Sequence, residues 1–268
     1  MPESLARELP LWLLFTIACG LAVAAIELGF RAGAARTKAR EHEQSGPVGA
    51  VVGAVLGLLA FMMAFTFSLA ANRFEARKSL LLEEVNAIGT AYLRAGLLPE
   101  PQRSDSQRLL REYAALRADV GAVIRESDGI ARFVTRSETL HERLWSQAGA
   151  LVTAGRASPV EALFVSALNE VFDLHTERVV FAAHYRIPTV VWSILAIASM
   201  LAMAILGFSF GLSGRRSVFA SLIVAVMYSS ILLLIVDLDR PLQGLLSVSQ
   251  QPMIELSTKL EASGPDQR

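Results

Sequence analysis

The polar residues that could form a metal site lie in the segment NEVFDLHTER, which contains Glu170, Asp173, His175 and Glu177. Carboxylates and imidazole are common metal ligands. Asp173 and Glu177 are one helical turn apart and would share a face, but Asp173 and His175 would point in different directions. The spacing therefore favours a solvated or bundle-facing polar face. A metal-dependent membrane enzyme that uses His175 is the less favoured alternative.

Other signatures of enzyme chemistry are weak in this sequence. His141 and Glu142 lack the second histidine of a zinc-binding helix. The sequence contains no glycine-rich phosphate loop and no nucleophile elbow, and its single cysteine, Cys19, lies in an apolar run. A catalytic thiol needs an electropositive and partly exposed setting, which such a run does not offer. We therefore expect a protein that is not an enzyme and that needs no metal ion or cofactor.

A second pattern joins small and aromatic residues in one apolar run. Gly49, Gly53, Gly57, Phe61 and Phe65 follow one another at intervals of four residues, which places them on one ridge of a helix. In lipid, glycines at this spacing let helix backbones approach closely, so the ridge could be a packing surface. Alternatively, in a symmetric ring of such helices, Phe61 and Phe65 would form an apolar constriction that gates ions by dewetting.

Charged residues of both signs lie where two of the apolar runs end. Arg73 and Arg77 follow the run that carries the ridge, and Asp237 and Asp239 follow the last apolar run. Both ends lie on the same side of a membrane whichever way the chain is inserted, so opposite charges at matching depth are expected to pair. The alternative is that Arg73 and Arg77 attract anions at the mouth of a pore, because rings of basic side chains favour anions.

The composition predicts that membrane-spanning helices position these residues. Of the 268 residues, 53% are hydrophobic and 19% are charged, which is too apolar for an ordinary soluble domain. A span needs about 20 apolar residues. The segments that come close to this length are Leu9–Phe30, Val48–Ala71, Pro188–Leu212 and Val218–Val236. The net charge is near zero and the basic residues are dispersed, so we expect no nucleic-acid surface.

The spans form two pairs on either side of a long polar insert, which is expected to be helical. Between Phe74 and Tyr92, apolar residues recur at the spacing of a packed helix seam. No proline or glycine separates this seam from the second span, so one helix is expected from about Val48 to Leu98, ended by Pro99. We predict an all-α, polytopic membrane protein. Its expected divisions are a first transmembrane pair at 9–72, the helical insert at 73–187, a second transmembrane pair at 188–238 and a C-terminal tail with a short helix at 239–268.

Two local features refine this outline. Glu27 and Arg31 lie one helical turn apart at the end of the first span, which predicts an ion pair near the membrane surface. A proton relay through Glu27 is the alternative. Within the insert, Ser158 and Pro159 are a plausible N-cap and first residue of a helix.

Several of these segments resemble a known family. AFTFSLAANRFEARKSLLLEEVNAIGTAYLRAGLLP, LNEVFDLHTER, GLSGRR and IVDLDRPLQGLLSVSQQP are similar to bacterial membrane proteins with a bestrophin-like domain, and the resemblance covers nearly the whole chain. The chain resembles true bestrophins more distantly. That likeness consists of two pairs of spans around a helical insert, a phenylalanine-rich second span that leads to Arg73 and Arg77, and a last span that ends in Asp237, Asp239 and a proline.

The resemblance implies a pentameric ion channel, mostly for anions such as chloride, whose second spans line a neck of three apolar rings. In this sequence the register of that neck coincides with Gly57, Phe61 and Phe65. Gly57 has no side chain, so the implied neck is shorter, and Phe74 stands where bestrophins carry tryptophan. Asp237 and Asp239 are a shorter acidic cluster than that of calcium-gated members, so calcium control does not follow.

The orientation of the chain in the membrane does not follow from its charges, because Lys and Arg are divided almost evenly between the two sides. The resemblance implies a bacterial inner-membrane protein whose insert and termini lie in the cytosol. Its expected partners are membrane lipid, small inorganic ions and further copies of the same chain. The alternative function is a non-conducting membrane scaffold or signalling protein whose helical insert binds a partner.

Overall fold

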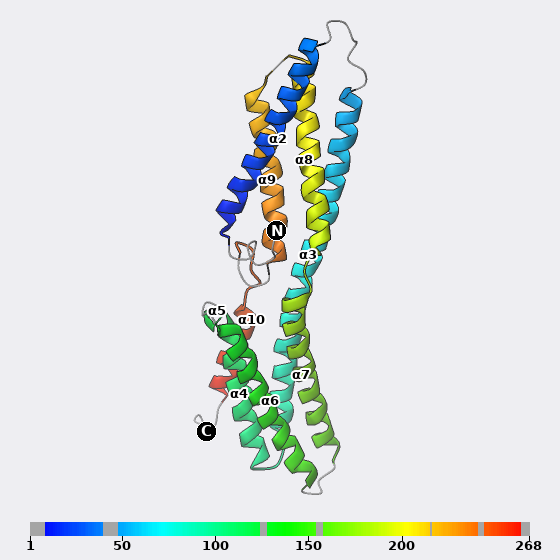
Figure 1. Ribbon diagram of the computed structural model, residues 1–268. Coiled ribbons are helices and arrows are strands. Elements are labelled where there is room, and N and C mark those ends of the chain that lie inside the picture. Colours follow the sequence, from blue (N-terminus) through cyan, green and yellow to red (C-terminus); the bar gives the residue numbers. More distant parts are fainter. Residues whose placement is uncertain are drawn as a thin grey trace. The chain divides into compact units, whose positions relative to one another are not determined.

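The computed structural model describes residues 9–39, 48–123, 128–153, 158–214, 216–240 and 244–263, and these contain helices and connecting turns without strands. Two compact units are present (Figure 1). We call Met1–Phe74 with Arg186–Leu246 the membrane unit, and Glu75–Tyr185 with Ser247–Arg268 the insert unit.

The membrane unit contains the predicted spans. They are α2 (Leu11–Ala39), the first part of α3 (Val48–Ala95), α8 (Thr189–Leu212) and α9 (Val218–Asp239), and each is long and apolar enough to cross a membrane. The prediction of an all-α, four-span membrane protein is confirmed. The α2 helix runs past the predicted end of the first span, and α3 ends at Ala95, where the chain turns through Gly96–Leu98 before Pro99.

The core of the membrane unit depends on a close crossing of α2 and α8. Gly29 and Gly33 of α2 face α8, and Gly207 and Gly211 of α8 face α2. A Cβ atom added at Gly207 would lie 1.9 Å from the carbonyl oxygen of Ile26, so only glycine fits there. Each helix thus carries a pair of glycines four residues apart, the spacing that allows helix backbones to touch in lipid. We did not predict this crossing.

Replacing Gly207 by alanine is expected to lower the free energy of unfolding of the membrane unit by about 1–3 kcal/mol, because the added methyl group would force α2 and α8 apart. The thermal unfolding midpoint in mild detergent measures this effect. Gly20→Ala is the matched control, since no described part of the chain comes within 4 Å of a Cβ atom at Gly20. Equal midpoints for the two variants would show that the crossing tolerates a side chain at Gly207.

The insert unit packs the second part of α3 with α4 (Gln102–Ala118), α5 (Val120–Val123), α6 (Gly129–Thr153) and α7 (Pro159–His184). Its core includes the large, fully buried side chains of Leu81, Tyr113, Leu144 and Phe164. The α7 helix begins where predicted: Ser158 is its N-cap, Pro159 is its first residue, and the Ser158 N–H donates to Glu161 Oε2 at 2.8 Å.

The C-terminal helix α10 (Gln251–Ala262) also belongs to the insert unit. It packs against α4, and Met253 and Leu260 bury their side chains in the same core as α3 and α7. Residues 247–263 therefore add to the hydrophobic core of the insert unit, a role that we did not predict for the tail.

Candidate pore ridge and buried ion-pair network

The α3 helix has two different faces along its membrane-spanning part. Leu59, Met63 and Ala70 are buried inside the subunit. Phe61 and Phe65 are 69% and 59% exposed, although they are large apolar side chains. At about 100° per residue they lie roughly on the opposite side of α3 from that buried face. The two phenylalanines therefore do not contribute to the core of their own subunit.

The three glycines of the predicted ridge are open in the same way. Among the described residues, nothing lies within 4 Å of a Cβ atom built at Gly49, Gly53 or Gly57. These glycines consequently pack against no neighbouring helix in the described part of the subunit, in contrast to Gly29 and Gly207. The whole ridge is available to contact lipid or another copy of the chain.

Arg73 of α3 pairs with Asp239 at the end of α9. Arg73 Nη1 lies 3.4 Å from Asp239 Oδ1, and Asp239 also accepts a hydrogen bond from the Ile187 N–H at 3.2 Å. Both charged side chains are largely buried, with 21% of Arg73 and 14% of Asp239 exposed. Arg77 lies beyond the membrane unit, in the part of α3 that belongs to the insert unit. Arg73 and Asp239 thus connect α3, the end of α9 and Ile187, two residues before α8.

Asp237 holds the turn that follows α9. Its carboxylate accepts hydrogen bonds from the N–H groups of Leu245 and Leu246, at 2.9 Å and 2.8 Å. Gly244 makes this turn possible because its φ is 156° and because a Cβ atom there would lie 2.2 Å from Asp237 Oδ1. Asp237 therefore has a structural role in binding backbone amides.

At the other end of the membrane unit, Glu27 forms the predicted contact with Arg31. Arg31 Nε lies 2.9 Å from Glu27 Oε1. A second guanidinium, that of Arg216, lies 3.0 Å from Glu27 Oε2, and this contact was not predicted. Arg216 is 189 residues away in the sequence, so periodicity could not connect it with Glu27.

A buried network of charged and polar side chains occupies the insert unit, centred on Glu84 of α3. The Glu84 carboxylate is fully buried and lies 2.9 Å from Arg117 Nε of α4. It also forms an ion pair with Arg178 of α7, and it accepts a hydrogen bond from the Tyr113 hydroxyl at 3.0 Å. One carboxylate therefore joins α3, α4 and α7 inside the hydrophobic core.

Neighbouring positive charges keep the Glu84 carboxylate ionised inside the hydrophobic core. Burial alone would raise the pKa of Glu84, but the guanidiniums of Arg117 and Arg178 outweigh it, so the pKa is lowered. Burial and the Glu84 carboxylate both raise the pKa of Tyr113, which keeps its hydroxyl protonated and able to donate. Glu84 is thus a carboxylate that serves only as an acceptor, with donors from three sides.

The two candidate histidines meet beside this network. The rings of His141 of α6 and His175 of α7 pack edge to face, with centroids 4.8 Å apart, and His141 also packs against Phe172. No group of three potential metal-binding side chains occurs among the described residues. His175 lies next to Tyr113 and Arg117, among aromatic rings. It does not group with the acidic residues that flank it in the sequence.

Because burial lowers the pKa of both His141 and His175, we expect acid to destabilise the insert unit. Burial, followed by the neighbouring charge of His175, lowers the pKa of His141 to about 3. Burial, followed by the charge of Arg117, lowers the pKa of His175 to about 4. In the unfolded chain both rings bind a proton below about pH 6.5. Because the unfolded state then holds more protons than the folded state, stability falls as the pH drops from about 6.5 towards 4.

The urea unfolding midpoint of the insert unit, measured between pH 7.5 and pH 4.5, tests this expectation. In a control variant, His141→Phe, the midpoint should fall less steeply with pH, because one of the two titrating histidines is removed. A midpoint that does not change over this range would contradict it.

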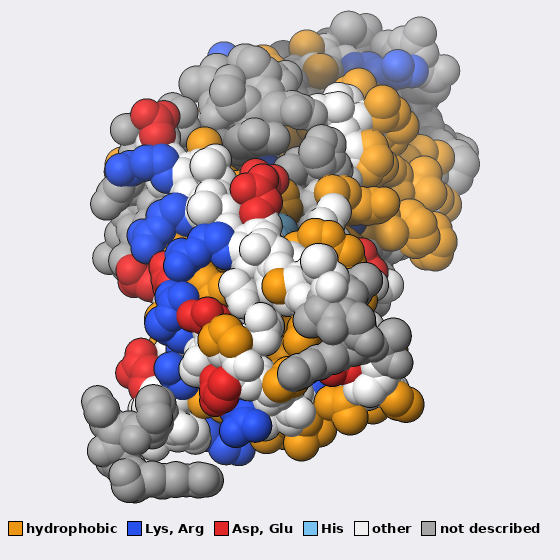
Figure 2. All heavy atoms as spheres, turned by 90° about the horizontal axis from the view of Figure 1, so that it is seen from below, with side chains coloured by type: hydrophobic (Ala, Val, Ile, Leu, Met, Phe, Trp, Pro, Cys, Tyr) orange, Lys and Arg blue, Asp and Glu red, His pale blue; other side chains and the backbone are white. Residues whose placement is uncertain are grey.

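On the face shown in Figure 2, the described Lys and Arg side chains lie mostly along one edge, and Asp and Glu side chains lie among them. A surface that binds nucleic acid through phosphates would show a continuous basic stripe. On the described part of this face, acidic side chains interrupt the basic ones.

The fold defines an all-helical membrane protein with four spans in two pairs, one pair on each side of a helical insert in the sequence. Residues 14–253 match the Bestrophin-like domain, and the chain belongs to this family. A comparison with curated proteins finds no match.

Solved structures of similar fold come from a bacterial bestrophin homologue of Klebsiella pneumoniae. Two substituted variants of that protein are 17% and 16% identical to this chain, with TM-scores of 0.65 and 0.67; the matches cover 92% of this chain in both cases, and 96% and 97% of those chains. A further structure of the homologue, obtained by Zn-SAD phasing, is 17% identical with a TM-score of 0.64, and the match covers 94% of this chain and 96% of that chain. The shared fold extends over the membrane spans and the insert alike.

Proposed function

We propose that this protein is one subunit of a homo-oligomeric ring, a pentamer, that conducts small inorganic ions passively through a path lined by α3. The observation that supports this most directly is the exposure of Phe61 and Phe65, at 69% and 59%, on a span whose opposite face is buried. Membership of the Bestrophin-like family points in the same direction, because the bestrophins that the sequence resembles are pentameric channels.

In the proposed ring, each ridge faces the common axis. Phe61 and Phe65 form two apolar rings, and an apolar constriction controls conduction through the ease with which it dewets. Gly57 has no side chain to add a third ring, so the neck is two rings long. Gly49 and Gly53 lie where neighbouring α3 helices come close, because the absence of a side chain lets backbones approach.

The charges at the mouth favour anions only slightly. Arg73 and Arg77 would supply positive potential, which attracts anions in a ring. Arg73 lies 3.4 Å from Asp239, whose negative charge offsets part of that potential. A small preference for anions such as chloride over cations is therefore what the proposal predicts. We place the ring in the bacterial inner membrane with the insert unit in the cytosol, as the resemblance to bestrophins implies.

The oligomeric mass in mild detergent tests the ring. We expect five subunits for the wild-type protein and a smaller assembly for Gly53→Leu, because a bulky side chain on the ridge blocks close contact between copies. Within the described part of its own subunit, no atom lies within 4 Å of a Cβ atom at position 53. Gly20→Leu is the matched control, since Gly20 is equally open but lies on α2.

A wild-type monomer or dimer in the same detergent would contradict the ring and would favour the alternative function, a non-conducting scaffold whose insert binds a partner. The phenylalanines would then be lipid-facing.

A further inference from the structure

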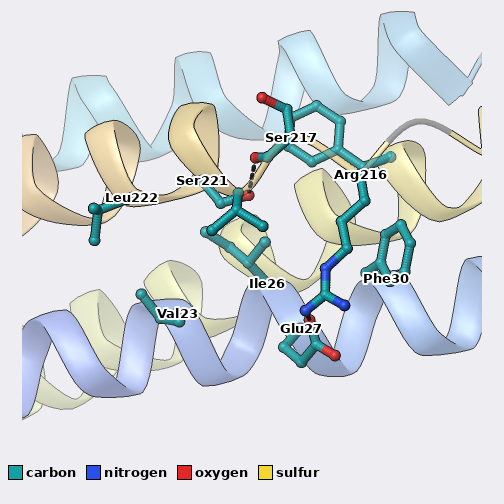
Figure 3. A pocket seen from close by; sticks show the side chains of 10 residues that line it. Val23, Ile26, Glu27, Phe30, Arg216, Ser217, Ser221 and Leu222 are labelled. Atoms are coloured by element: carbon teal, nitrogen blue, oxygen red, sulfur yellow. Dashed lines mark hydrogen bonds and ion pairs between the residues drawn. The ribbon is translucent and has the colours of Figure 1, made fainter.

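A pocket of about 120 Å³ lies in the membrane unit among α2, α8 and the beginning of α9 (Figure 3). One part of its wall is apolar and is formed by Val23, Ile26, Val218 and Leu222. Val218 and Leu222 are 65% and 50% exposed, so this wall continues onto the outer surface of the subunit. In a membrane protein that surface is in contact with lipid chains.

The other part of the pocket carries the charged side chains of Glu27 and Arg216. Figure 3 shows the Arg216 side chain reaching across to Glu27, beside the ring of Phe30. The Arg216 guanidinium lies 5.6 Å from the Phe30 ring centroid and 3.0 Å from Glu27, and Arg31 lies 2.9 Å from the same carboxylate. Arg31 adjoins the pocket without lining it, and it shares the Glu27 carboxylate with Arg216, so these three side chains together carry one net positive charge.

Both guanidiniums retain capacity for another anion. Each carries five N–H donors in a planar fork, a geometry that matches a phosphate group. Their side chains are 73% exposed for Arg31 and 60% exposed for Arg216, so an approaching ligand can reach them. The apolar wall lies in the same pocket as Arg216, where Ile26 and Val218 are lining residues. A ligand that satisfies both parts has an anionic phosphate and a hydrocarbon chain.

We propose that this pocket binds one anionic phospholipid per subunit. Its phosphate lies on Arg31 and Arg216, and the first part of one acyl chain lies along Val23 and Leu222. The position suits this ligand because α2 and α9 are membrane spans and the two arginines lie at one end of their apolar runs, where lipid headgroups are found. A lipid without net charge would gain less, since the site carries a net positive charge.

Native mass spectrometry of the purified protein tests the proposal, with phosphatidylglycerol and phosphatidylcholine offered at equal concentration. We expect phosphatidylglycerol to bind preferentially, with one molecule per subunit at saturation. Arg216→Gln should weaken its binding about fivefold, the effect of one basic side chain near an anionic lipid. Glu27→Gln should strengthen it, because the carboxylate no longer competes for the two guanidiniums. Arg36→Gln, an exposed arginine of α2 outside the pocket, is the matched control.

A second variant keeps the test decisive if Arg216→Gln folds poorly. Leu222→Trp fills the apolar wall and leaves every charge in place, so it should weaken the binding of both lipids. Inorganic phosphate at millimolar concentration separates a lipid site from a simple anion site, and it should not displace the lipid. Equal binding of the two lipids, an equal effect of Arg36→Gln, or displacement by inorganic phosphate would each overturn the proposal.

Discussion

Replacing Glu84 by glutamine is expected to lower the free energy of unfolding of the insert unit by about 3–5 kcal/mol, the cost of breaking a buried ion pair on one side. Glutamine keeps the size of the side chain, so the loss does not come from a cavity. It comes from the guanidiniums of Arg117 and Arg178, whose charges then stay in the core without their carboxylate. The Tyr113 hydroxyl also loses its charged acceptor.

Urea unfolding followed by the fluorescence of Trp145 measures this loss, because Trp145 lies on α6 of the insert unit. The other two tryptophans, Trp12 and Trp192, lie in the membrane unit and are replaced by phenylalanine in the reference protein. Glu83→Gln is the matched control: Glu83 is the adjacent residue of α3 and is exposed, so its change should stay within about 0.5 kcal/mol. Similar urea midpoints for the two variants would mean that the network does not stabilise the unit.

Shortening Phe65 to alanine is expected to raise ion flux through reconstituted protein severalfold. In the proposed ring Phe65 forms one of two apolar constrictions, so removing its phenyl group widens the path and lets it stay hydrated. Phe65→Glu should also raise flux and should shift the preference from anions to cations, because a ring of carboxylates attracts cations.

Liposomes loaded with a chloride or potassium indicator measure both changes. Phe67→Ala is the matched control, since Phe67 is an exposed phenylalanine on the same span, about 200° around the helix from Phe65. It should leave flux and selectivity unchanged. Flux indistinguishable from wild type in both Phe65 variants would remove Phe65 from the conduction path.

The spans and the ridge were predictable because they depend on local sequence alone. A long apolar run must become a helix in lipid, where every backbone N–H and C=O group needs an internal partner. Residues four apart must then share a face, which is why Gly57, Phe61 and Phe65 could be placed on one ridge before their exposure was known. The start of α7 at Ser158 and Pro159 follows from equally local chemistry.

The buried network was not predictable in this way, because its members come from distant parts of the sequence. Glu84 stands next to Glu83 in a run that reads as a solvated face, and its partners Arg117 and Arg178 are 33 and 94 residues away. Only the packing of α3, α4 and α7 distinguishes the buried carboxylate from the exposed one. The contact between Arg216 and Glu27 was unpredictable for the same reason, because the two residues are far apart in the sequence.

The crossing of α2 and α8 is an intermediate case. Gly29 with Gly33, and Gly207 with Gly211, have the spacing that we noticed in the second span at Gly49 and Gly53. The spacing indicates a surface that allows close approach, but it does not identify the partner. In the structure the first two pairs face each other inside the subunit, and Gly49, Gly53 and Gly57 of α3 stay open among the described residues. This difference is why we assign α3 to contacts between subunits.

The accessibility of position 65 from water tests directly whether the α3 ridge lines a pore. In a Cys19→Ser background, which removes the only natural cysteine, Phe65→Cys and Phe67→Cys proteins are reconstituted and treated with a charged methanethiosulfonate reagent while ion flux is recorded. We expect the reagent to change flux in the Phe65→Cys protein and to leave flux in the Phe67→Cys protein unaltered. No reaction at position 65, or the same response at both positions, would contradict a pore lined by the α3 ridge.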